Sequence, residues 1–85
     1  MIDPKARKLV TDLATLLATY ACAEAIVRDT TKRQFNMRMS MYVFKDAMAN
    51  TMDLDIRQNQ AKCDHAERAF RRKLIQLRKL LDGND

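Results

Sequence analysis

The side chains with the most reactive chemistry are few and scattered. The chain has one histidine, His65, one serine, Ser40, and two cysteines, Cys22 and Cys63. Nucleophilic catalysis needs a nucleophile, a base and an orienting group that converge, and no motif brings these residues together. Cys63 and His65 are two positions apart, so on a helix they point about 160° away from each other and cannot share one ion. We therefore expect a protein that is not an enzyme, with no catalytic residue, no metal, no cofactor and no small-molecule substrate.

Positive charge is concentrated near the C-terminal end of the sequence. Six cations fall within a segment of twelve residues. These cations are Arg68, Arg71, Arg72, Lys73, Arg78 and Lys79. On a helix most of them share the side opposite an apolar stripe, with Ile75 among them. Such a surface binds phosphates or an acidic protein patch through the ammonium groups of lysine and the planar forks of arginine. We call it the Arg-rich face and define it as Arg68, Arg71, Arg72, Ile75, Arg78 and Lys79. A solvated outer face near a helix C-terminus would have the same composition.

Composition describes a folded protein with one domain, residues 1–85. The chain has 47% apolar residues, 32% charged residues and a net charge of +5, which mildly favours acidic partners. Cys22 and Cys63 lie far apart and form no CxxC motif, so free thiols in a reducing compartment are the simpler interpretation. We therefore expect a cytoplasmic protein.

The N-terminal region partly resembles a secretory signal. Lys5, Arg7 and Lys8 precede an uncharged stretch, residues 13–23, that ends in small residues. Asp12 and several threonines dilute the apolar character of this region. Eleven uncharged residues are also too few for a membrane span, which needs about 20. We therefore expect no membrane contact.

Long helices must position all of these groups. Residues 5–82 contain neither glycine nor proline, the two residues that mark most turns. Asp3 followed by Pro4 is a helix start, because Asp caps the free amides and Pro at the first position loses no hydrogen bond. The sequence predicts an all-α fold with a helix over about 4–28 and another over about 54–82. The first helix could also continue to about residue 50, so the architecture is a long helical hairpin or a three-helix arrangement.

The predicted first helix has a narrow apolar seam at alternating spacings of 3 and 4, formed by Leu9, Leu13, Leu16, Tyr20, Ala23 and Val27. If the helix continues, the seam extends through Thr30, Gln34, Met37, Met41, Phe44 and Met48. A second line of small residues follows the same spacing about 140° around the helix and consists of Ala14, Ala18, Ala21 and Ala25. We therefore expect this helix to be the most buried element, packed between neighbours.

Two segments could interrupt the helices. Thr31 and Gln34 have the spacing of a capping box, which allows a turn at 29–31. Residues 50–55 are a stronger break, because they cluster side chains that cap helices and tolerate turns. The last helix then carries an apolar stripe of Ile56, Cys63, Ala66, Phe70, Leu74, Leu77 and Leu81. Its segment 57–62 has no large apolar residue and should be solvated or lie at an outer end of the bundle.

Methionines and aromatic residues gather in the middle of the chain: Met37, Met39, Met41, Met48 and Met52, with Phe35, Tyr42, Val43 and Phe44. Methionine adapts to irregular partners, so this patch is a candidate recognition surface. Its helical spacing favours ordinary core instead.

Within this patch, residues 34–43 also alternate between apolar and polar side chains, as a strand does. This segment resembles the strand and first helical turn of ribbon-helix-helix repressors of the Arc and Mnt type. The resemblance implies a dimer whose paired strands enter the DNA major groove, with Gln34, Asn36 and Arg38 as base-reading side chains. It covers about ten residues, and the glycine-containing turn of that family is absent.

Together these observations predict a small non-enzymatic interaction protein that binds and modulates a larger macromolecule through its Arg-rich face or its Met-rich patch. Long seams leave apolar surface uncovered, so we expect a homodimer, in which two hairpins form a four-helix bundle. A protein partner is favoured. The alternatives are a nucleic-acid-binding protein, including a ribbon-helix-helix repressor, and an assembly or chaperone-like subunit.

Overall fold

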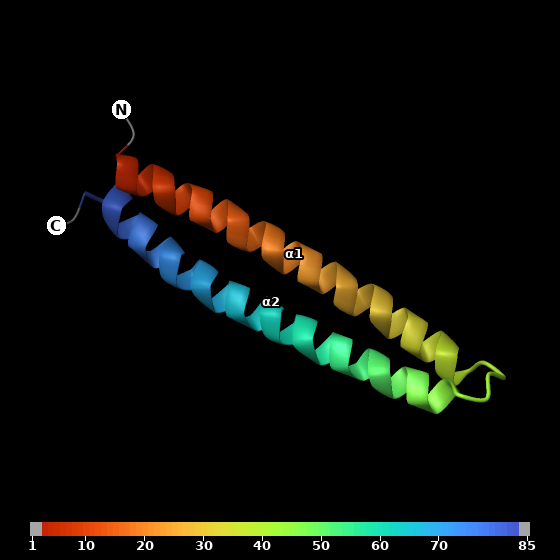
Figure 1. Cartoon of the computed structure of the whole chain (residues 1–85). Helices are drawn as coiled ribbons and strands as arrows, with labels where there is room; N and C mark the ends of the chain where they lie inside the picture. The colour runs from red at the N-terminus through yellow and green to blue at the C-terminus, as the bar shows by residue number, and fades with distance from the viewer. Residues whose placement is uncertain (1–2, 84–85) are drawn as a thin grey trace.

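The chain folds into two long antiparallel helices (Figure 1). The computed structural model describes residues 3–83, with α1 over Pro4–Arg38 and α2 over Lys45–Leu81. A turn of six residues, 39–44, connects them. The rod measures 63 × 18 × 13 Å, and both ends of the chain lie at the end opposite the turn. The all-α helical hairpin predicted from the sequence is confirmed, and neither a third helix nor a strand occurs within residues 3–83.

Helix α1 begins where the Asp-Pro pair predicts. Asp3 is the N-cap, and its carboxylate accepts a 2.8 Å hydrogen bond from the backbone N–H of Lys5. Pro4 occupies the first helical position, where an absent N–H costs no intrahelical bond. The start of the helix is therefore set by local chemistry.

The helix does not break at residues 29–31. Thr31 Oγ1 donates to the Val27 carbonyl, which is how threonine is accommodated inside a helix. Helix α1 ends instead at Arg38, where Ser40 organises the turn. Its hydroxyl donates to the Met37 carbonyl at 2.6 Å and accepts from the backbone N–H of Tyr42 at 3.3 Å. A serine therefore supplies the turn without glycine or proline.

The predicted break at residues 50–55 is wrong, because these residues lie inside α2. Helix α2 begins at Lys45 rather than near residue 54. Thr51 Oγ1 donates to the Ala47 carbonyl at 3.0 Å, so a cap-forming side chain bonds backward within the helix. Ala49 and Ile56, which flank this segment, are both buried against α1. Packing on both sides thus overrides the local preference for a turn.

The predicted seam of α1 faces α2. Leu13 and Ala23 are buried, and the half-buried members are Leu9, Leu16, Tyr20, Val27, Thr30, Gln34 and Met37. The seam stops there, because Met41, Phe44 and Met48 are 100%, 62% and 42% exposed. Its extension to residue 48 is therefore wrong, since the chain turns at residue 39 and leaves the register.

The stripe of α2 is confirmed in part. Ile56 and Ala66 are buried and Cys63, Phe70 and Leu77 are half-buried, whereas Leu74 and Leu81 are exposed. Asn59 joins the seam although segment 57–62 was expected to be solvated. Its side-chain Nδ2 donates to the Asp55 carbonyl at 2.9 Å, which satisfies a polar group at a buried position. The buried side of α2 therefore includes one amide, between Ile56 and Cys63.

Small side chains let the two helices approach closely. Ala23, Ala49 and Ala66 are only 3%, 1% and 2% exposed, and no large side chain among residues 3–83 is fully buried. Near the turn, Gln34 Nε2 donates to the Ala49 carbonyl at 2.9 Å, which ties α1 to the start of α2. The core is thus a thin layer between two helices.

This thin core leaves much surface uncovered. The chain exposes 6950 Å², whereas a compact protein of 9.9 kDa exposes about 5,200 Å². The excess is about 1,700 Å². The second alanine line, Ala14, Ala18, Ala21 and Ala25, is exposed as well. Helix α1 is therefore not the more buried element within one chain, as it has three buried residues against five in α2.

Ala49→Leu tests the close approach of the helices. The larger side chain has no room at a position 1% exposed, so we expect a loss of about 1–3 kcal/mol in the free energy of unfolding, measured by urea denaturation. Ala47→Leu is the control, because Ala47 is exposed on the same helix and its change should stay within about 0.5 kcal/mol. Equal effects of the two substitutions would contradict this packing.

Candidate functional site

Every member of the Arg-rich face is exposed. Arg68, Arg72 and Ile75 line the side of α2 turned away from α1, with Arg71 and Arg78 on its flank. Lys79 lies at the edge of this side, where it borders a hollow that Lys5 and Lys8 of α1 also line. Arg71 is held by Glu67 of the preceding turn at 3.1 Å. The other four cations form no ion pair within residues 3–83, and the side chain of Ile75 is 55% exposed. The structure therefore brings the predicted residues together on one free surface.

Charge is distributed unevenly along the rod. Nine of the sixteen cations lie in residues 3–12 and 67–83, which form the end opposite the turn, against four acidic residues there. Residues 68–81 contain no acidic residue. This end of the hairpin therefore carries most of the net positive charge of the part of the chain that the structure describes.

Asp12 anchors one lysine of the cluster to α1. Its carboxylate lies 3.2 Å from Lys73 Nζ and 3.2 Å from Lys8 Nζ. Hydrogen bonds from Lys73 first and Lys8 second lower the pKa of Asp12 below its usual value. Lys73 is therefore a structural cation between the helices and does not belong to the Arg-rich face.

The reactive side chains do not converge. Ser40 lies in the turn, whereas His65 is twenty residues beyond the start of α2, roughly 30 Å along the helix. Cys22 is exposed, and Cys63 faces the seam, with its Sγ 3.9 Å from the Tyr20 carbonyl. Burial raises the pKa of the Cys63 thiol and makes it a weaker nucleophile. Within residues 3–83, no three metal-ligating side chains gather at one point.

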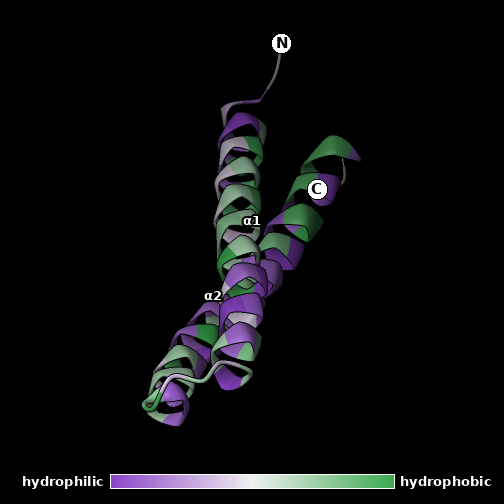
Figure 2. Cartoon of the chain, turned by 90° about the vertical axis from the view of Figure 1, so that its right-hand side faces the viewer, coloured by the Kyte–Doolittle hydropathy of each residue, from purple (hydrophilic) through white to green (hydrophobic). Residues whose placement is uncertain are grey.

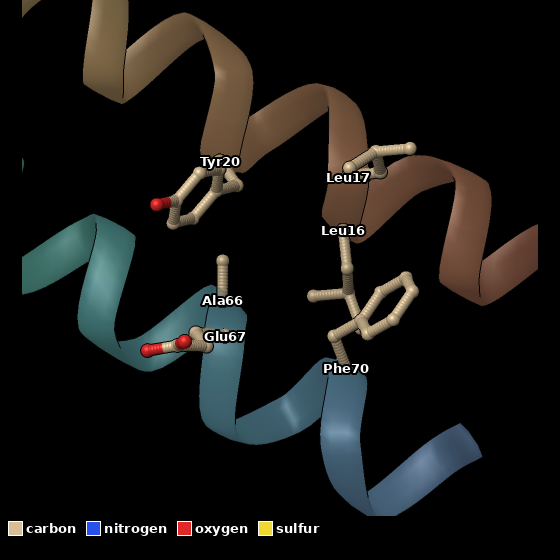
Figure 3. A pocket seen from close by; sticks show the side chains of 6 residues that line it. All are labelled: Leu16, Leu17, Tyr20, Ala66, Glu67 and Phe70. Carbon is tan, nitrogen blue, oxygen red and sulfur yellow. The ribbon is translucent and has the colours of Figure 1, made fainter.

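An open apolar groove runs along one side of the helix pair (Figure 3). Its lining residues are Leu16, Leu17 and Tyr20 of α1 and Ala66, Glu67 and Phe70 of α2. Leu16 and Phe70 point toward each other, whereas Leu17 projects away from α2 and is 58% exposed. The charge of Glu24, followed by desolvation, raises the pKa of Tyr20, so this phenol stays neutral. The groove holds about 160 Å³ and suits packing better than polar recognition.

The turn carries most of the Met-rich patch to the surface. Met39, Met41, Tyr42, Val43 and Phe44 are exposed by 49–100%, and the rings of Tyr42 and Phe44 meet edge to face at 5.7 Å. Figure 2 shows hydrophobic colouring in the first half of α1 and at this turn, whereas the last turns of α1 are largely hydrophilic. Ordinary core is therefore the wrong interpretation for these five residues, whereas Met37 and Met52 are half-buried as core residues are.

The alternative DNA-reading strand is absent. Gln34, Asn36 and Arg38 lie in the last turns of α1, and residues 39–44 form no strand. Gln34 points toward α2, where its amide donates to the Ala49 carbonyl, while Asn36 and Arg38 are exposed. The strand prediction is wrong because the seam of α1 retains its helical register through Met37.

Helix α1 is long and apolar enough, by length and composition, to cross a membrane. Only 11% of its most apolar window is buried within the chain. A helix that packs against another protein has the same composition. The exposed apolar side of α1 is therefore a candidate contact surface.

No family model, no curated protein and no solved structure matches this chain. We therefore infer its function from the surfaces of the hairpin.

Asp12→Asn tests the contact between Lys73 and α1. A carboxylate with a lowered pKa stabilises the fold above its unfolded pKa, and this stabilisation disappears as the pH falls through its folded pKa. We expect the variant to unfold at lower urea concentration than the parent at pH 7, with the difference vanishing in acid. Asp29→Asn is the control, because Asp29 pairs with Arg33 within α1 alone. A difference that persists unchanged in acid would contradict the assignment.

Proposed function

We propose that this chain is a non-enzymatic interaction protein that binds an acidic surface of a larger protein and thereby modulates it. The supporting observation is the Arg-rich face, on which four cations are exposed and have no intrachain partner within residues 3–83. Exposed arginines without intrachain partners can form bidentate hydrogen bonds with carboxylates at little reorganisation cost.

The composition of the face favours a protein over a polyanion. Ile75 lies between the cations and is 55% exposed, so a partner can combine charge contacts with an apolar one. From Arg68 to Lys79 the face extends roughly 16 Å along a straight helix, the scale of a helix-sized contact.

Nucleic acid is the second candidate. The nine cations at the end opposite the turn support it, because phosphate binding depends on the number of neutralised charges. We do not propose that a strand reads the DNA, since residues 34–38 are helical. An assembly or chaperone-like subunit remains an alternative that predicts a stoichiometric complex with one cognate chain.

We also propose that two copies pair along the long sides of the rod. The excess of about 1,700 Å² exceeds the roughly 800 Å² that each partner buries in a standard interface. Val10 and Leu17 project from α1 with 53% and 58% of their surface exposed, and Leu17 lines the groove. Residues 13–23 contain no charge on any side, so a second helix pair can cover them without desolvating ions. The two free thiols suit a cytoplasmic protein.

Charge reversal tests the Arg-rich face. Arg68→Glu combined with Arg72→Glu should abolish capture of the partner from a nuclease-treated lysate, because both cations face outward. Arg57→Glu with Lys62→Glu is the matched control: it makes the same charge change on exposed residues of α2 outside the face and should preserve capture.

Loss of all capture on nuclease treatment would overturn the protein-partner proposal in favour of nucleic acid. An electrophoretic shift that weakens steeply with salt would then identify phosphate contacts. Equal loss in both charge-reversal variants would show that net charge, and not the face, governs binding.

Leu17→Asp tests the pairing of two copies. We expect the parent to sediment at twice 9.9 kDa and the variant at 9.9 kDa, because an aspartate at this position places a charge in the apolar contact. Leu54→Asp is the control, since Leu54 is 61% exposed but lies on α2 away from the groove. A parent protein that sediments only as a 9.9 kDa species at micromolar concentration would contradict the proposal.

A further inference from the structure

We propose that the turn end of the hairpin inserts into the interface of an anionic lipid membrane. We call this end the apolar tip and define it as Phe35, Met39, Met41, Tyr42, Val43, Phe44 and Met48. The surfaces proposed for partner binding and for pairing, which are the Arg-rich face and the groove, do not include these residues.

The turn has an unusual composition for an exposed connection. Five of its six residues, 39–44, are apolar or aromatic, and Ser40 supplies its side-chain hydrogen bonds. Turns are usually built from glycine, proline, asparagine, aspartate and serine, which cost nothing when solvated. A polar turn would join α1 and α2 equally well, so the exposed apolar side chains point to a contact outside the chain.

The tip lies apart from the surface through which two copies are proposed to pair. It lies at the far end of a 63 Å rod, away from both chain ends (Figure 1). The groove, in contrast, is formed by residues 16–20 of α1 and residues 66–70 of α2, well back from the turn. A second copy that covers these long sides therefore leaves the end of the rod free.

The way the tip exposes its side chains favours lipid over a protein groove. Met41 is 100% exposed, Val43 82% and Met39 71%, so apolar groups surround the turn and do not form one stripe. A protein groove would contact a single side of such an element, whereas the acyl boundary of a bilayer surrounds it. Tyr42 and Phe44 add aromatic rings of the kind that reside at the membrane interface.

Charge around the tip complements anionic headgroups. Arg38 and Lys45 bracket the turn from its two sides, and Lys32 lies two turns back on α1. None of the three forms an ion pair within residues 3–83, while Arg33 nearby is held by Asp29 at 3.1 Å. Asp46 is the one acidic residue between positions 30 and 52. Cations behind an apolar end are the arrangement by which proteins bind anionic lipid surfaces.

Cosedimentation with vesicles tests the apolar part of the contact. We expect the full chain to bind phosphatidylcholine vesicles that contain about 30% phosphatidylserine and to bind pure phosphatidylcholine more weakly. Met41→Asp combined with Val43→Asp should weaken binding on the order of tenfold, because both side chains would enter the acyl boundary. The control is Leu54→Asp with Ile26→Asp, which adds the same charges at exposed apolar positions outside the tip.

A second measurement separates tip insertion from attraction of the Arg-rich face to the same vesicles. The chain has no tryptophan, so Met41→Trp and Ile75→Trp each introduce one probe. With brominated acyl chains in the vesicles, we expect strong quenching of the probe at position 41 and little at position 75. Lys45→Ala should weaken binding about fivefold, the effect of one cation near the surface.

Three results would overturn the proposal. The first is equal binding of the tip variant and its control, with helical content checked by circular dichroism. The second is quenching at position 75 and not at position 41, which would assign the vesicle contact to the Arg-rich face. The third is no binding of the parent to phosphatidylserine vesicles, which would indicate that the tip inserts into a groove of another protein.

Discussion

The contact between α1 and α2 is the constraint on which the rest of the molecule depends. It is a single seam in which alanines at positions 23, 49 and 66 bring the helices close together. A two-helix contact of this kind buries one stripe of each helix and cannot bury more, because each helix has only one neighbour. The remaining apolar groups, including Val10 and Leu17, stay on the surface. Exposed apolar surface is therefore a direct consequence of the hairpin geometry.

The same geometry separates two kinds of surface. Cations collect at the end where the chain begins and finishes, while apolar side chains collect at the turn. A rod 63 Å long keeps these ends far beyond the reach of screened electrostatics, which extends about 8–10 Å at physiological salt. Each end can therefore bind its own partner, and the uncharged middle of α1 is left for pairing with a second copy. As we propose, the protein would bring these surfaces and their partners together.

Local chemistry explains what the sequence could predict. Asp3 and Pro4 fixed the start of α1, the 3-4 spacing identified its buried side through Met37, and the helical arrangement of Arg68 and Arg72 located the basic surface. The sequence did not predict the turn because residues 39–44 contain no glycine or proline, and five of them are apolar or aromatic, as core residues usually are. The predicted break at residues 50–55 was wrong because their capping side chains are tolerated inside a helix whose neighbouring Ala49 and Ile56 are buried. The apolar tip was recognised as a candidate surface, but only the position of the turn shows that it is exposed.

One hairpin leaves much of its apolar surface uncovered, and we propose that a second copy covers it. The concentration dependence of thermal unfolding tests this most directly, because folding coupled to association depends on mass action. If two copies pair, the midpoint temperature falls clearly on roughly hundredfold dilution. A midpoint that is independent of protein concentration would show that a single hairpin is stable alone and would contradict the claim.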